Sequence, residues 1–172
     1  MRALVIGTAF AMLSSAAWAQ QPAAPSPAQA ARLFASSADI AAFVAKAKSE
    51  RKPDQANFVQ PVVQRAPYTV NLEYRVAGLN ANAAVHEREA ELFYVVDGSG
   101  TMVTGGKLRD EKRTNAENLQ GSGIDNGMTR HVAKGDVIMV PEGSPHWFSQ
   151  VDGALVLMSL HLPRAGSGGA TP

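Results

Sequence analysis

The sequence predicts an all-β domain preceded by one helix. Short apolar runs recur between turn residues along most of the chain, as is typical of a sandwich or barrel. Residues 68–76 alternate apolar and polar side chains, which indicates a strand with one face in water. Helical periodicity is confined to the part of the chain before residue 53. Together these patterns predict a β-barrel or sandwich over residues 53–163.

The first 19 residues have the pattern of a signal peptide. Arg2 precedes an apolar run, and Ala17-Trp18-Ala19 is a small-x-small cleavage site. The apolar run is short for the roughly 20 residues that cross a bilayer, which disfavours a membrane anchor. We therefore predict cleavage after Ala19 and a periplasmic or secreted protein. Residues 20–35 are rich in Pro, Ala, Gln and Ser and are predicted to be a flexible linker.

Charge and cysteine content exclude several classes of partner and site. Removal of residues 1–19 leaves 15 basic and 15 acidic residues, so the formal net charge of the mature chain is 0. Nucleic acids and anionic membranes require a basic face, so we expect neither as a partner. The 172-residue chain has no cysteine, which excludes disulfides, thiolate metal sites and cysteine nucleophiles. A small molecule is the expected partner.

A helix is predicted over residues 36–52. Ser36 and Asp39 approximate a capping box at its start, and Pro53 ends it. Its apolar side chains fall at helical spacing on one face, namely Ile40, Phe43, Val44 and Ala47. The pattern predicts a helix that packs on the outside of the domain.

The barrel strands are read from short apolar runs bounded by turns. They cover residues 58–64, 68–76, 91–96, 101–103, 131–133, 137–140, 146–148 and 154–162, with a hairpin turn at Asp97-Gly98. Residues 109–129 interrupt this rhythm with a polar, Gly-rich insertion, which is either a functional lid or a mobile loop. Residues 164–172 are predicted to be a disordered Gly/Ser tail.

The most informative stretch runs from Gly135 to Phe148. A β-branched run is followed by a rigid turn containing Pro141 and Gly143, so the backbone that presents His146 is fixed. The spacing of Gly135, Pro141, Gly143 and His146 resembles the second conserved motif of the cupin superfamily. That motif has Asn at the position of Gln150.

The first cupin motif resembles residues 78–98. Gly78 and Gly98 match its two glycines, His86 matches the second histidine of its His-x-His pair, and Glu91 matches its glutamate. The first histidine of the pair is replaced by Ala84. The resemblance implies a double-stranded β-helix, a small jelly-roll barrel whose two halves carry the two motifs.

The resemblance also implies a divalent metal on His86, Glu91 and His146. Two imidazoles and one carboxylate suit iron, manganese, nickel or zinc and leave coordination positions for substrate. Ala84 removes one expected imidazole. Water, His161 or a carboxylate such as Glu89 would compensate for it, and the sequence does not decide among them.

Strand parity predicts which side chains line the cup around this metal. If Glu91 points inward, so do Phe93 and Val95, and if His146 points inward, so does Phe148. Tyr74 is placed with them, because it belongs to the more apolar face of its strand.

Other residues are expected to point away from the cup. Trp147 is predicted to face outward, which is compatible with the homodimer that is common in the resembling family. His161, taken alone, is read as an outward-facing residue near the rim, and His131 as a structural residue.

Two functions stay open. The first is a metal-dependent enzyme of oxygenase, isomerase or lyase type acting on a small organic molecule. The second is a non-catalytic module that binds a small ligand after loss or weakening of the metal. No Asp is placed to orient His146 toward Ser144, so a nucleophilic triad is not supported. The glycines at 121 and 123 do not open a helix, so neither is a phosphate loop.

Overall fold

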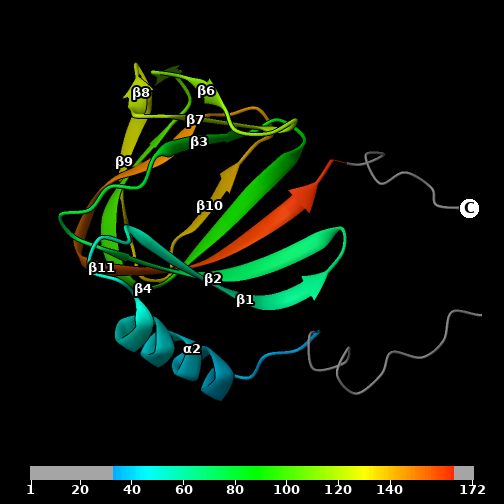
Figure 1. Ribbon diagram of the computed structural model, residues 1–172, viewed down its shortest axis with the longest axis vertical. Helices are drawn as coiled ribbons and strands as arrows, with labels where there is room; N and C mark the ends of the chain where they lie inside the picture. Colours follow the sequence, from blue (N-terminus) through cyan, green and yellow to red (C-terminus); the bar gives the residue numbers. More distant parts are fainter. Residues whose placement is uncertain (1–32, 165–172) are drawn as a thin grey trace, which may run out of the picture.

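The protein, as a computed structural model that describes residues 33–164, is a β-barrel with one helix against its outside (Figure 1). The helix α2 spans Ser37–Glu50. The strands are β1 (Asn57–Arg65), β2 (Tyr68–Val76), β3 (Ala83–His86), β4 (Glu89–Thr104), β5 (Lys107–Arg109), β6 (Lys112–Arg113), β7 (Asn118–Gly121), β8 (Gly123–Asp125), β9 (Met128–Ala133), β10 (Val137–Val140) and β11 (His146–Pro163). The predicted signal peptide, most of the predicted linker, and the tail after residue 164 lie outside the described residues.

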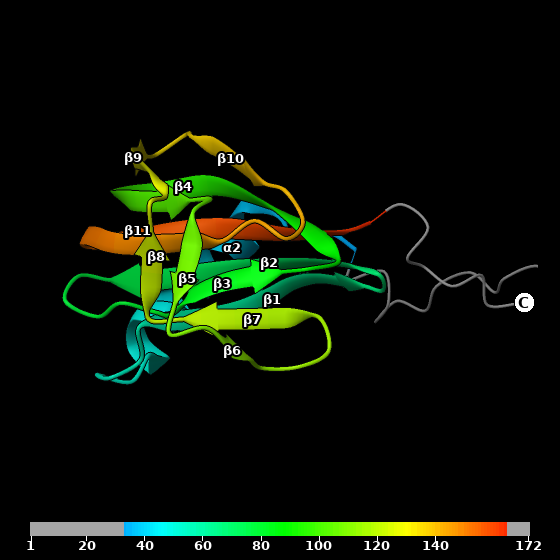
Figure 2. The ribbon, with the colours of Figure 1, turned by 90° about the horizontal axis from the view of Figure 1, so that it is seen from above.

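The two long strands β4 and β11 organise the sheet. They pair antiparallel over nearly their whole lengths, from His146 opposite Thr104 to Pro163 opposite Glu89. On its other edge β11 pairs with β3 at its start and with β2 further along. The other edge of β4 is taken by β10 and β9, and Figures 1 and 2 show these strands wrapping around a common interior. Register shifts in the β4–β11 pairing let the long strands bend around it.

The barrel interior holds a buried apolar cluster. Its buried members are Phe93, Val95, Met102, Val132, Val140, Phe148, Val151, Leu155 and Leu157. They come from β4, β9, β10 and β11, so the cluster ties together strands that are far apart in sequence. This confirms the all-β prediction and fixes which face of β4 and β11 points inward.

The helix covers the outer face of β1 and β2. Ser36 accepts from the Asp39 amide while the Asp39 carboxylate accepts from the Ser36 amide, so the predicted capping box is present. The apolar face of α2 packs with Leu72, Tyr74 and Val156 in a second cluster. No helix in residues 33–164 is long and apolar enough to cross a membrane.

The insertion at 109–129 is folded rather than loose. It forms β6, β7 and β8 and the start of β9, and β7 pairs with β3 at the rim of the barrel. A third cluster beneath it contains Leu108 and Ile124, with Trp147 packed against them. The indole of Trp147 donates to the Ala81 carbonyl at 2.9 Å. Trp147 thus points away from the interior cluster that contains Phe148, as parity predicted, but the insertion covers it.

Candidate metal centre

The site is built on the buried carboxylate of Glu91. Glu91 lies near the start of β4 and is only 3% exposed. The hydroxyl of Ser159, in β11, donates a short hydrogen bond to Glu91 Oε1. Burying an ionised carboxylate costs free energy unless the charge is paired. The other partners of Glu91 therefore indicate the function of the site.

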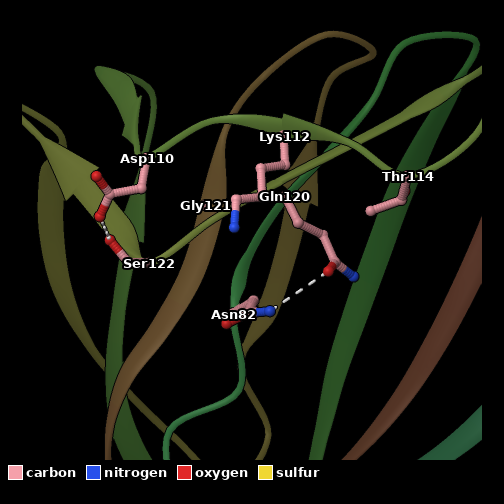
Figure 3. A pocket seen from close by; sticks show the side chains of 7 residues that line it. All are labelled: Asn82, Asp110, Lys112, Thr114, Gln120, Gly121 and Ser122. Carbon is pink, nitrogen blue, oxygen red and sulfur yellow. Dashed lines mark hydrogen bonds between the residues drawn. The ribbon is translucent and has the colours of Figure 1, made fainter.

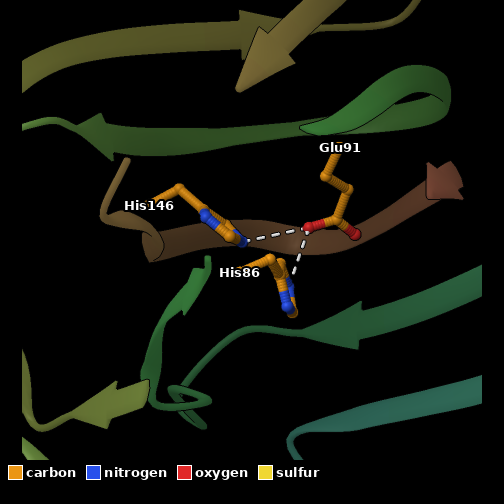
Figure 4. A group of neighbouring side chains, drawn as sticks. All are labelled: His86, Glu91 and His146. Atoms are coloured by element: carbon orange, nitrogen blue, oxygen red, sulfur yellow. Dashed lines mark ion pairs between the residues drawn. The ribbon is translucent and has the colours of Figure 1, made fainter. Parts of the chain in front are cut away.

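Two histidines converge on the other oxygen of Glu91. His146 Nε2 lies 3.1 Å and His86 Nε2 lies 3.3 Å from Glu91 Oε2 (Figure 4). His86 ends β3, and His146 begins β11 just after the predicted turn, so three different strands supply the three side chains. The fold thus brings together the three residues for which the sequence predicted a metal site.

Their spacing fits a shared ion. Zinc and similar ions bind nitrogen and oxygen at about 2.0–2.2 Å, which places neighbouring ligand atoms roughly 2.9–3.5 Å apart. The separations of 3.1 and 3.3 Å fall within that range. The donor atoms of His86, Glu91 and His146 all lie within 4.8 Å of one another. The residues present therefore fit a divalent first-row metal.

The far sides of both imidazoles are held by acceptors. His86 Nδ1 lies 2.6 Å from Asn118 Oδ1 in β7, and His146 Nδ1 lies 3.4 Å from the Ser144 carbonyl. An acceptor beside Nδ1 is the usual arrangement around a histidine that binds a metal through Nε2. The insertion thus contributes, through Asn118, to the orientation of a predicted ligand.

Electrostatics keep Glu91 ionised. Burial raises the pKa of Glu91, but hydrogen bonds with His146, His86 and Ser159 outweigh burial and hold its pKa well below the usual range. Burial lowers the pKa of His86, but its contacts with Glu91 and Asn118 raise it by more, so its pKa lies above that of a free imidazole. The site is thus a buried carboxylate, Glu91, that stays ionised and is surrounded by imidazoles able to bind a cation.

His161 lies beside this cluster, on the other oxygen of Glu91. Its Nε2 lies 3.4 Å from Glu91 Oε1, and its Nδ1 lies 2.7 Å from Glu89 Oε1. The donor atoms of His86, Glu89 and His161 form a second group within 4.8 Å. The expectation that His161 faces outward is wrong, because His161 pairs directly opposite Glu91 in β11 and so shares its face.

The aromatic lining agrees with strand parity except at Tyr74. Phe93 lies 5.9 Å from the His146 ring and 5.2 Å from Phe148, measured between centroids. Phe93, Val95 and Phe148 all belong to the interior cluster. Tyr74 instead packs under α2, which makes its face of β2 apolar without making it the inward one. The placement of Tyr74 in the cup is therefore wrong.

A separate hollow lies beside the insertion. It has a volume of about 480 Å³ and an open, polar lining (Figure 3). Its lining residues are Asn82, Asp110, Lys112, Thr114, Gln120, Gly121 and Ser122. None of the predicted site residues lines it.

Sequence reasoning missed two residues that orient the site, Ser159 and Asn118. Ser159 and His161 are the polar residues of the otherwise apolar run 154–162, two positions apart, and this spacing could have placed both on one face. No pattern in the sequence pointed to Asn118, because its contact depends on how the insertion folds.

Comparisons with known proteins find similar solved structures and one matching family model. Three solved structures with similar folds are TT1209 from Thermus thermophilus (18% identity, 66% of this chain, 88% of that chain, TM-score 0.46), a protein with a double-stranded beta-helix domain from Klebsiella pneumoniae subsp. pneumoniae (14%, 66%, 82%, 0.48), and KdgF from Halomonas sp. (17%, 67%, 84%, 0.46). No curated protein matched the chain. A family model described as Cupin matches residues 69–163. Because that match covers more than half of the chain and contains all three predicted ligands, this protein belongs to the cupin family.

Proposed function

We propose that this protein is an exported cupin that binds a divalent metal on His86, Glu91 and His146 and acts on a small organic molecule beside it. The observation that carries the proposal is the convergence of two imidazole nitrogens, at 3.1 and 3.3 Å, on one oxygen of a buried carboxylate. Neutral imidazoles and one carboxylate leave a positive charge on a bound divalent ion.

The side chains around the centre divide it into a closed and an open side. His146 and Glu91 are nearly inaccessible, and Phe93 packs beside them. His86 is 19% exposed and Glu89 is 31% exposed, so solvent reaches the centre from their side. A small organic molecule entering there would meet polar groups first and the apolar wall of Phe93 last.

A bound metal would supply Lewis-acid chemistry by polarising a substrate oxygen. The residues of the chain would hold and orient its surroundings. Glu91 offsets part of the ion's charge, Asn118 fixes the ring of His86, and Phe93 excludes water from one side. This arrangement is compatible with oxygenase, isomerase or lyase chemistry.

A non-catalytic ligand-binding cupin is the second candidate, and Ala84 favours it. Ala84 lies directly opposite His146 in the pairing of β3 with β11, so a methyl group stands where the motif has an imidazole. A centre with one donor fewer binds metal more weakly. In this alternative the cup holds a small ligand without turnover.

We also propose that the protein is exported and that it forms a dimer. The pattern of residues 1–19 supports export. An N-terminus beginning at Gln20 in protein recovered from a secreting host would support cleavage after Ala19, whereas an intact Met1 would contradict it. A dimer is expected from the family, and sedimentation of the purified protein tests it.

Metal analysis of purified protein tests the proposal. Wild type, His146→Ala and the control His131→Ala are purified without chelators and reconstituted separately with iron, manganese, nickel and zinc. His131 is an exposed histidine paired with Asp152, so its loss leaves the centre intact. We expect near-stoichiometric metal in wild type and His131→Ala and little in His146→Ala.

Absence of metal in wild type after reconstitution would overturn the proposal. If metal is bound, turnover is screened on oxidisable and isomerisable small molecules, under air and under nitrogen. Metal-dependent turnover that disappears in His146→Ala supports the enzyme. Ligand-induced thermal stabilisation without any turnover supports the binding module instead.

A further inference from the structure

We propose that His161 is a third imidazole ligand of the metal centre and replaces the motif histidine that is missing at Ala84. The inference rests on the proposed function and adds a residue to it. Neither cupin motif contains His161, which lies near the end of the last strand. Its position next to Glu91 is a property of the fold that no motif supplies.

The first support is distance. His161 Nε2 lies 3.4 Å from Glu91 Oε1, close to the 3.1 and 3.3 Å at which His146 and His86 approach Oε2. The rings of His86 and His161 are 5.2 Å apart between centroids, as His86 and His146 are at 5.3 Å. Three Nε2 atoms therefore approach the two oxygens of one carboxylate at similar distances, His86 and His146 at Oε2 and His161 at Oε1.

The second support is orientation. The carboxylate of Glu89 accepts at 2.7 Å from Nδ1 of His161, as the Asn118 oxygen does from His86. The amide of Asn118 is itself fixed, because its Nδ2 donates to Asn115 Oδ1 at 3.0 Å. Each ring thus has an acceptor beside Nδ1 and points Nε2 toward Glu91, which is how metal-binding histidines are usually held.

The third support is the set of polar groups around Glu91. The carboxylate is buried, and three imidazoles and the Ser159 hydroxyl lie beside its two oxygens. A divalent cation held there would offset the buried negative charge, and its donor set would be three imidazoles and one carboxylate.

The layout of the strands explains how His161 can replace the histidine that is missing at Ala84. β11 begins with His146 and reaches His161 near its end, and both residues pair with β4, opposite Thr104 and Glu91 respectively. Register shifts bend β11 between them, so one strand brings two imidazoles to one carboxylate. No further ligand is then needed on β3 to compensate for Ala84.

Nitrogen NMR of protein labelled with 15N in its histidines tests the inference without any variant of the site. The chain has four histidines, so four pairs of imidazole nitrogens are followed while Zn²⁺ is added. We expect the Nε2 signals of His86, His146 and His161 to shift with the first equivalent. The signals of His131 should not move, and the His131→Ala variant assigns them.

The outcomes separate the inference from the function on which it rests. If only His86 and His146 shift, His161 is not a ligand, although the metal site stands. If His161 shifts only with a second equivalent, it belongs to a separate site with Glu89, and the inference is overturned. If no signal shifts, the metal site and the inference both fall.

Affinity measurements give a second readout. Zinc competition against a chromogenic chelator should show at least a tenfold loss of affinity in His161→Ala relative to His131→Ala. Glu89→Gln, which keeps the shape of the side chain but removes its charge, should lose roughly 10–100-fold, the usual effect of an outer partner of a metal-bound histidine. Equal affinities in His161→Ala and His131→Ala would overturn the inference.

Discussion

Two buried carboxylates of this barrel, Glu73 and Glu91, are satisfied in different ways. Glu73 Oε2 accepts from the Arg75 guanidinium at 2.6 Å and from Asn57 at 2.9 Å. Arg75 carries a permanent positive charge. The neighbours of Glu91 are imidazoles, which carry no permanent charge and are common metal ligands.

The difference indicates what each carboxylate is for. Glu73 has a complete and permanent partner, and Arg75 also stacks 4.8 Å from the centroid of the Phe148 ring, so this pair stabilises the fold. Glu91 has partners whose charge depends on what binds them. A site of this kind is suited to an exchangeable cation, and this is the physical basis for the proposed metal centre.

The largest expected effect concerns the permanent pair. Arg75→Ala leaves Glu73 buried without its cation and should lower the free energy of unfolding by about 3–5 kcal/mol. Urea denaturation of wild type and variant measures this difference. The double variant Glu73→Gln/Arg75→Met removes both charges and should recover most of the loss. A loss below about 1 kcal/mol in Arg75→Ala would mean that Glu73 is not dependent on Arg75.

The next effect concerns the support of the exchangeable site. Asn118→Ala removes the acceptor that orients His86 and should weaken metal binding roughly 10–100-fold. Gln120→Ala is the matched control, since Gln120 lies on the same strand and contacts Asn82 instead. Zinc competition assays on both variants decide the matter. Equal affinities would show that the insertion does not support the site.

The smallest effect concerns a carboxylate in water. Asp39, at the start of α2, accepts hydrogen bonds from the Ser36 hydroxyl and amide. These bonds lower the pKa of Asp39 below that of an ordinary aspartate. Separately, Ser36 is the N-cap of α2, and loss of a Ser cap in Ser36→Ala should cost about 1 kcal/mol of unfolding free energy.

The pH dependence of that loss follows from the direction of the pKa shift. A carboxyl whose pKa is lowered in the folded state stabilises the fold above its unfolded pKa and loses that contribution as the pH falls through the folded pKa. The difference between wild type and Ser36→Ala should thus shrink on acidification below about pH 4. A difference that stays constant with pH would assign the whole effect to the uncharged hydrogen bond between the Ser36 hydroxyl and the Asp39 amide.

Much of the fold and the centre of the site were predictable from the sequence. Turn spacing indicated the strands, and parity placed Phe93 and Phe148 on the same faces as Glu91 and His146. The prediction for Tyr74 was wrong because an apolar strand face can be covered by a helix as well as by the barrel interior.

The residues that complete the site were harder to predict. His161 reaches Glu91 through the β4–β11 register, which includes shifts that the sequence does not reveal. Asn118 reaches His86 through an insertion whose polar, Gly-rich composition resembles a loop although it pairs as strands. Long-range pairing decided both contacts, and local patterns carry little information about it.

The most direct test of the central claim is the free energy of unfolding of wild type measured with and without a divalent metal such as Zn²⁺. If Glu91 and its imidazoles hold an exchangeable cation, metal at 100 times its dissociation constant should stabilise the folded protein by about 2.7 kcal/mol. The same addition should leave Glu91→Gln almost unchanged. A wild-type protein whose stability does not respond to any first-row divalent metal would contradict the account.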